Sequence, residues 1–171
     1  TIIVPRHPER ADEICASLTE QGLSYARRSE GDQVDPGTDI LVGDTIGDMG
    51  LYLRLSEIVF VGRSLAGKGG QNPLEPAMLN SAILSGRDIQ NFRDSYQRLT
   101  ASGGAKFVRD RETLAGAVNF LLTNEAARRQ MMAASFETVE AMRGALGHTM
   151  RALDPFIRPL VVQARLGGRG G

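Results

Sequence analysis

The chain has 171 residues, 42% of them hydrophobic and 23% charged, which fits one globular domain with a sizeable core. Its 20 Lys and Arg residues balance its 20 Asp and Glu residues, and this zero formal charge gives no electrostatic indication of a duplex nucleic-acid binder, so we do not expect a nucleic-acid partner. The single cysteine, Cys15, excludes an intrachain disulfide, and its apolar, helical neighbours predict a buried thiol that packs as a small hydrophobe.

Two histidines and one cysteine give no basis for a zinc site, so we expect neither a metal nor a cofactor. No apolar stretch approaches 18 residues, and no membrane-spanning helix is expected. The absence of cysteine pairs and of a charged leader favours a cytoplasmic setting. Because the chain opens inside an apolar, β-branched run without Met, we expect it to be a fragment of a longer protein.

Short β-rich runs alternate with helical patterns along the chain. In chain order the expected elements are strand 2–4, helix 11–21, strands 23–26 and 39–42, helix 48–55, strand 58–61, helix 73–80, strand 82–84, helix 92–102, strand 106–108, and helices 112–122, 126–142 and 146–153. Strands separated by single helices predict an α/β fold with a right-handed, Rossmann-like, doubly wound parallel sheet. This domain should cover residues 1–155, and the acid-free segment 156–171 is predicted to be a disordered tail.

The most informative segment is the Gly-rich turn that leads from the fourth expected strand into the next helix. Asn72 is a suitable N-cap, Pro73 suits the first helical position, and Glu75 stands three residues after the cap, as in a capping box. Gly69 and Gly70, just before the cap, allow a ligand to approach the backbone closely. Free N–H groups at the helix start therefore predict an anion site at the carboxyl edge of the sheet.

Two interpretations of this turn stay open: a phosphate-binding turn, or a flexible loop before a well-capped helix without a ligand. Glu75 is correspondingly either a capping carboxylate or an acceptor for hydrogen bonds from sugar hydroxyls, because a carboxylate repels a phosphate. The turn has neither the Gly-Lys-Ser/Thr end of a Walker loop nor the Gly-x-Gly-x-x-Gly dinucleotide fingerprint.

Two further clusters follow other strands at the same expected edge. Arg6 offers a planar, permanently charged fork that suits phosphate or carboxylate, and His7 can donate to the same anion. The Gly-rich segment 43–50 follows the third strand, where main-chain groups can read a planar base. The alternatives are a solvated charge for Arg6, a capping or packing role for His7, and an ordinary turn for segment 43–50.

The chain resembles the Kdo (3-deoxy-D-manno-octulosonic acid) transferases of lipopolysaccharide synthesis. The resemblance lies in the order and spacing of three segments: Pro5–Arg10, Gly43–Gly50 and Gly69–Pro76. That family is similar to other GT-B glycosyltransferases, which have two Rossmann-like domains, a catalytic cleft between them and no metal requirement. The resemblance implies that residues 1–155 are the C-terminal, nucleotide-sugar-binding domain of such an enzyme, truncated at its N-terminus. The enzyme would move Kdo from CMP-Kdo to a lipid A precursor at the cytoplasmic face of the bacterial inner membrane, with peripheral membrane contact.

The resemblance also implies donor-binding roles for two residues after the first strand and two after the third. Arg6 would engage the donor phosphate or the Kdo carboxylate, with His7 nearby. Met49 and Gly50 would frame the cytosine.

The remaining implied roles fall in the Gly-rich turn and the helix after it. Gly70, Gln71 and Asn72 would present main-chain and amide donors to the phosphate. Glu75 would bind the ribose hydroxyls.

The resemblance places the catalytic carboxylate and the acceptor surface in the N-terminal domain, so no catalytic residue is expected here and this chain alone should be inactive. Stabilising the CMP leaving group with fixed donors is the chemical role left to it. Two other function classes stay open: a non-catalytic nucleotide-binding module that kept the fold, and a GT-B-like nucleotide-sugar epimerase.

Overall fold

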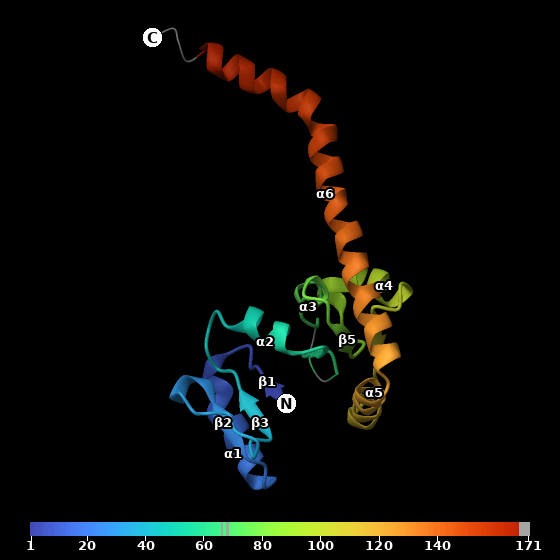
Figure 1. The fold of residues 1–171 in the computed structure, drawn as a ribbon. Coiled ribbons are helices and arrows are strands. Elements are labelled where there is room, and N and C mark those ends of the chain that lie inside the picture. The colour runs from blue at the N-terminus through green and yellow to red at the C-terminus, as the bar shows by residue number, and fades with distance from the viewer. Residues whose placement is uncertain (66, 68, 168–171) are drawn as a thin grey trace. The chain divides into compact units, whose positions relative to one another are not determined.

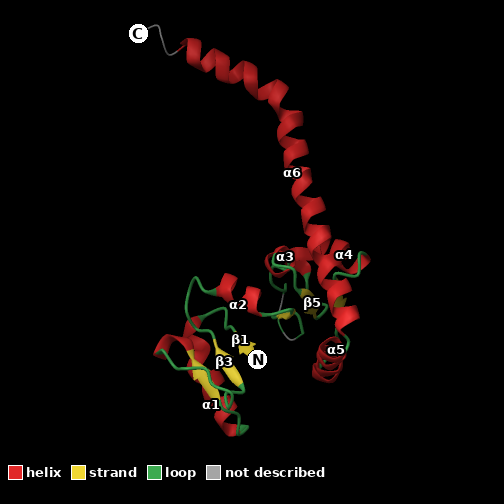
Figure 2. Cartoon of the chain, in the orientation of Figure 1, coloured by secondary structure: helices red, strands yellow, loops and turns green. Residues whose placement is uncertain are grey.

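The computed structural model describes residues 1–65, 67 and 69–167. The chain divides into two compact units, Thr1–Ser56 and Glu57–Gly171. Each unit is built around its own sheet of three parallel strands, with helices between successive strands (Figures 1 and 2). The predicted α/β class with parallel strands is therefore confirmed.

The first unit has the strand order β1-β3-β2, and all neighbouring strands are parallel. Its elements are β1 (Ile2–Ile3), a 3₁₀ helix (Pro8–Arg10), α1 (Ala11–Glu20), β2 (Tyr25–Arg27), a second 3₁₀ helix (Arg28–Glu30), β3 (Ile40–Val42) and α2 (Met49–Leu55). Because β3 lies in the middle, the segments that leave β1 and β2 flank the segment that leaves β3.

The core of the first unit forms between α1 and the central strand. Its buried members are Ala11, Cys15, Leu18, Ile40 and Val42. The three helical members recur at intervals of four and three residues on one helix face, and the two strand members alternate onto one face of the sheet. Cys15 is 6% exposed, and burial raises the pKa of its thiol. The prediction of a buried cysteine that packs as a hydrophobe is confirmed.

The second unit has the strand order β4-β5-β6, again parallel throughout. Its elements are β4 (Ile58–Val61), α3 (Leu74–Met78), β5 (Ala82–Ser85), a 3₁₀ helix (Gln90–Phe92), α4 (Arg93–Ala101), β6 (Ala105–Phe107), α5 (Arg111–Thr123) and α6 (Glu125–Gly167).

Strand β5 is covered on both faces, and all four of its residues are buried. On one face Ile83 clusters with residues of α3, α4 and α6, namely Ala77, Leu99 and Val139. On the other face Ala82 and Leu84 cluster with residues of α5 and α6, namely Leu121 and Met131. Helices therefore cover both sides of this sheet, which is the doubly wound arrangement expected from the sequence.

The structure differs from the predicted elements in two respects. The strands are shared between two sheets instead of one, because a strand pattern in the sequence does not identify the partner of that strand. Helix α6 runs without a break through Gly144 and Pro155 to Gly167, whereas two helices and a disordered segment from residue 156 were expected. A glycine inside a helix costs only about 1 kcal/mol, and a proline can kink a helix without ending it.

Figure 1 shows α6 changing direction towards its red end, and residues 168–171 of the predicted tail lie outside the described residues. Within the described part of the chain, no helix combines the length and the apolar character that crossing a membrane requires.

Candidate functional site

The predicted site residues lie in, or directly after, the segments that follow strands β1, β3 and β4. In the first unit they are Arg6, His7, Met49 and Gly50, and in the second they are Gly70, Gln71, Asn72 and Glu75. Each group is placed at the carboxyl end of parallel strands, where α/β proteins commonly bind ligands.

Arg6 and His7 follow β1, and both are exposed. Ile3 of β1 pairs with Val42 of β3, so the segments after these two parallel strands leave the same edge of the sheet. The structure thereby brings Arg6 and His7 to the edge from which segment 43–50 departs. His7 makes no capping hydrogen bond with its side chain, and its Nδ1 lies 3.7 Å from a carboxylate oxygen of Glu9. The capping and packing alternatives for this histidine are therefore not supported.

Met49 and Gly50 are the first two residues of α2. Met49 is 39% exposed, and the carbonyl of Gly50 accepts a hydrogen bond of 2.7 Å from Nη1 of Arg54. Just before them, the hydroxyl of Thr45 donates to the carboxylate of Asp48 at 2.6 Å and lowers the pKa of that carboxyl. An exposed thioether beside a glycine backbone provides an apolar surface of the kind a flat base requires. The contact with cytosine stays a prediction.

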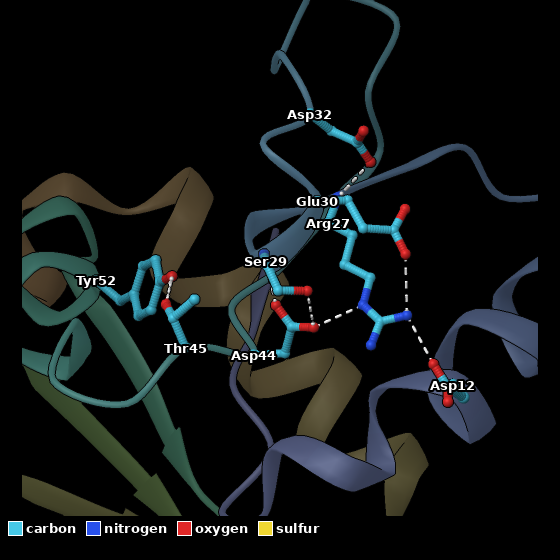
Figure 3. Close-up of polar contacts among 8 residues, drawn as sticks. All are labelled: Asp12, Arg27, Ser29, Glu30, Asp32, Asp44, Thr45 and Tyr52. Carbon is cyan, nitrogen blue, oxygen red and sulfur yellow. Dashed lines mark hydrogen bonds and ion pairs between the residues drawn. The ribbon is translucent and has the colours of Figure 1, made fainter.

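A buried ion pair fixes the start of segment 43–50 (Figure 3). The side chain of Asp44 is 2% exposed, and its Oδ2 accepts hydrogen bonds of 2.6 Å from Nε of Arg27 and from the hydroxyl of Ser29. Its Oδ1 accepts the main-chain N–H of Ser29 at 2.9 Å. Nη1 of Arg27 also reaches Asp12 at 2.6 Å and Glu30 at 3.1 Å. This cluster ties β2 and α1 to Asp44, the second residue after β3.

The ion pair stays charged at neutral pH. Burial alone raises the pKa of Asp44, but the hydrogen bonds from Ser29 and Arg27 outweigh burial and lower the pKa to about 2. In return, the hydrogen bonds to Asp44 and Asp12 raise the pKa of Arg27. Sequence reasoning included Asp44 in a motif without giving it a role, and it missed Arg27 and Ser29. The signal available was an acidic residue two positions after an apolar strand.

Acid should weaken the first unit through Asp44. Because the folded state lowers this pKa, the carboxylate contributes fully above its unfolded pKa of about 3.9, and the contribution, roughly 2 kcal/mol, is lost as the pH falls through the folded pKa. Hydrogen exchange of the β3 amides, corrected for intrinsic rates between about pH 5 and pH 2.5, measures this loss. Asp44→Asn cannot titrate and should be less stable at pH 5 but less dependent on pH. If the unaltered chain and the Asp44→Asn variant lose stability equally with falling pH, Asp44 is not the cause of the loss.

The Gly-rich turn of the second unit is held by the segment after β5. Gly69 and Gly70 have φ angles of 92° and 66°, in the left-handed region that favours glycine. The N–H of Gly69 donates to Oε1 of Gln90 at 3.1 Å, and its carbonyl accepts the N–H of Asn91 at 3.1 Å. A Cβ on Gly70 would lie 2.7 Å from the carbonyl oxygen of Asp88. Both the backbone conformation and the available space therefore require glycine.

The residues after the turn lead into a short helix. Oδ1 of Asn72 accepts the N–H of Leu74 at 3.0 Å, but the N-cap of the helix is Pro73 and not Asn72, and no side chain makes a capping hydrogen bond there, so the predicted capping box with Glu75 does not form. Helix α3 begins at Leu74, one residue later than expected, and is five residues long. The carbonyl of Gln71 accepts a hydrogen bond of 3.3 Å from the hydroxyl of Tyr96, and Glu75 is exposed in the first turn. Sequence reasoning had no signal for the part that Tyr96 plays.

The two units define an α/β protein whose Gly-rich and Arg-bearing turns lie at the carboxyl ends of parallel strands. No family model matches the chain. The chain is 36% identical over 157 residues to the 3-deoxy-D-manno-octulosonic acid transferase of Bordetella pertussis and 32% identical over 157 residues to that of Haemophilus influenzae. In both cases the match covers 91% of this chain and 37% of the relative.

A solved structure shows the same relationship. The C-terminal CMP-Kdo binding domain of WaaA from Acinetobacter baumannii superposes with a TM-score of 0.77 and 31% identity, over 81% of this chain and 72% of that domain. The chain therefore belongs to the 3-deoxy-D-manno-octulosonic acid (Kdo) transferase family. It corresponds to the C-terminal part of these GT-B glycosyltransferases and spans 37% of the length of the two relatives.

Proposed function

We propose that this chain is the donor-binding domain of a Kdo transferase and that it holds CMP-Kdo. The observation that carries the proposal is the double-glycine turn at the carboxyl end of β4, which is fixed by contacts with Asp88, Gln90 and Asn91. A turn that is fixed before the ligand arrives binds an anion without losing conformational freedom. Family membership and the CMP-Kdo binding domain among the similar structures support the same conclusion.

In the second unit, Gly70, Gln71 and Asn72 donate to the donor phosphate through main-chain and amide groups. The exposed carboxylate of Glu75 accepts hydrogen bonds from the ribose hydroxyls. Because fixed N–H groups stabilise negative charge as it develops, the same donors assist departure of the CMP leaving group.

In the first unit, the guanidinium of Arg6 binds the phosphate or the Kdo carboxylate, with His7 beside it. Met49 and Gly50 frame the cytosine. The buried pair of Arg27 and Asp44 holds the segment that carries these last two residues, and its part in binding is indirect.

For the whole enzyme, we propose transfer of Kdo to a lipid A precursor at the cytoplasmic face of the inner membrane. The acceptor surface and the catalytic carboxylate are assigned to the N-terminal domain of such an enzyme, the peripheral membrane contact belongs to the full-length protein, and no metal or cofactor takes part. This chain alone binds the donor without catalysing transfer.

Titration of the chain with CMP by calorimetry tests the proposal. Arg6→Ala combined with Glu75→Ala should weaken CMP binding at least tenfold, because one contact to the phosphate and one to the ribose are lost together. The matched control is Arg98→Ala with Glu137→Ala, which removes the same charges from exposed positions on α4 and α6 and should leave affinity unchanged. Equal CMP affinity in the two double variants would rule out the assigned site.

A further inference from the structure

Each strand of the second sheet is followed two residues later by an arginine: Arg63 after β4, Arg87 after β5 and Arg109 after β6. The last residues of these strands, Val61, Ser85 and Phe107, are paired with one another across the sheet. The three arginines therefore leave the same edge of the sheet at the same level, and all three are exposed. We call this set the arginine edge.

Hydrogen bonds beyond the strands keep these segments side by side. The N–H of Gly86 donates to the hydroxyl of Ser64 at 2.8 Å, and the N–H of Asp88 donates to the carbonyl of Ser64 at 3.0 Å. On the other side, the N–H of Val108 donates to the carbonyl of Ser85 at 2.8 Å. Neighbouring strands lie about 4.8 Å apart, so three long side chains that start from adjacent strand ends can reach one ligand.

The positive charge of the arginine edge is not neutralised by ion pairs. In the ranges that the structure describes, no carboxylate forms a salt bridge with any of the three guanidiniums. Arg87 lies over the ring of Phe107, 6.0 Å from its centre. The neighbouring Asp110 uses Oδ1 to accept the N–H of Thr113 at 2.8 Å, which caps α5; the hydrogen bonds from Thr113 and, to a smaller extent, the charge of Arg109 lower the pKa of this carboxyl. Asp88, half-buried beside Arg87, is the other adjacent acid, so positive charge is in excess at this edge.

The backbone conformation of Arg63 is a further reason to single out this residue. Its φ is 57°, in the left-handed region that is disfavoured for residues with a side chain and that glycine adopts without steric cost. A non-glycine residue in this conformation has a strained backbone, and residues with strained backbones are frequent at functional sites. Arg63 is therefore held at a position where glycine would meet less backbone strain.

We propose that the arginine edge binds a phosphate monoester, carried by a sugar or by a lipid, as a second anion site beside the double-glycine turn. Arginine forks match the oxygens of a phosphate two at a time. A monoester carries about two negative charges near neutral pH and suits three guanidiniums better than a singly charged phosphodiester does. Asp88, next to Arg87, also packs against Gly70, so the two sites are adjacent. The inference goes beyond the proposed function and does not depend on it.

Titration of the full chain with inorganic phosphate and with glucose 1-phosphate, followed by amide chemical shifts at low salt, tests the site. The triple variant Arg63→Gln, Arg87→Gln, Arg109→Gln should bind both probes at least tenfold more weakly. The control triple Arg98→Gln, Arg129→Gln, Arg143→Gln loses the same charge from α4 and α6 and should change affinity less than twofold. The corresponding triple Lys variant keeps the charge but loses the planar fork, and its affinity should fall between the two.

Vesicles separate the two sources of the phosphate. Binding to phosphatidic acid vesicles but not to phosphatidylglycerol vesicles, lost in the triple Gln variant, assigns a lipid-borne monoester, whereas binding of free glucose 1-phosphate assigns a sugar phosphate. Equal binding by the triple Gln variant and its control, or no binding of either probe or vesicle by the unaltered chain, overturns the proposal. The CMP titration with Arg6 and Glu75 replaced reports on the donor site separately, so either site can fail without the other.

Discussion

Replacing Asp44 with alanine should destabilise the first unit by about 3 kcal/mol, because removal of one partner from a buried ion pair leaves the other partners unsatisfied. The N–H and hydroxyl of Ser29 lose their acceptor, and so does Nε of Arg27. Arg27 keeps its contacts with Asp12 and Glu30, which places the effect at the lower end for a buried pair. Native-state hydrogen exchange at the β3 amides measures the change.

Asp12→Ala is the matched control for this prediction. Its carboxylate binds the same guanidinium at 2.6 Å, but the side chain is 80% exposed. An exposed pair contributes less than about 1 kcal/mol, so the control should be nearly as stable as the unaltered chain. If both substitutions destabilise the unit equally, burial of Asp44 is not what gives the pair its strength.

Replacing Gly70 with alanine should weaken CMP binding more than tenfold and destabilise the second unit by about 2 kcal/mol, since left-handed strain and a steric clash add together. At a φ of 66°, the new Cβ would meet the carbonyl of Asp88 at 2.7 Å. This is backbone, which cannot rotate away, so the turn itself must move. Calorimetry with CMP and urea unfolding measure the two effects.

Gly103→Ala separates conformational strain from loss of the site. Gly103 has a φ of 83°, and a Cβ there would meet no atom within 4 Å. This variant should lose about 1 kcal/mol through strain alone and should keep its affinity for CMP. Equal losses of CMP affinity in the two alanine variants would mean that the double-glycine turn has no special part in binding.

Local sequence patterns predicted most of the secondary structure. The continuous apolar run at residues 58–61 became β4, and the pattern at 48–55 became α2 (Met49–Leu55), because hydrophobic periodicity is a property of neighbouring residues. The pattern failed for α6, where separate helices at 126–142 and 146–153 and a disordered segment from residue 156 were expected. Division of the strands between two sheets was also beyond the sequence, since it depends on long-range pairing.

The site shows the same contrast between local and distant contacts. The turn and the start of α3 lie within one short segment, and the sequence predicted the turn and placed the helix start within one residue. The contacts that support the site join residues far apart: 17 positions separate Arg27 from Asp44, and 25 separate Gln71 from Tyr96. Which distant side chain meets a turn is decided by tertiary packing, and a single sequence carries little local trace of it.

Because Cys15 is buried in the first unit, the two units differ in how a thiol-selective reagent reports on their opening. Cys15 is the one thiol among the 171 residues, and it lies in the core of the first unit with its pKa raised. A thiol-selective reagent therefore modifies the chain only when that unit opens, and the second unit stays silent. Labelling kinetics can thus follow the opening of one half of this chain without an engineered probe.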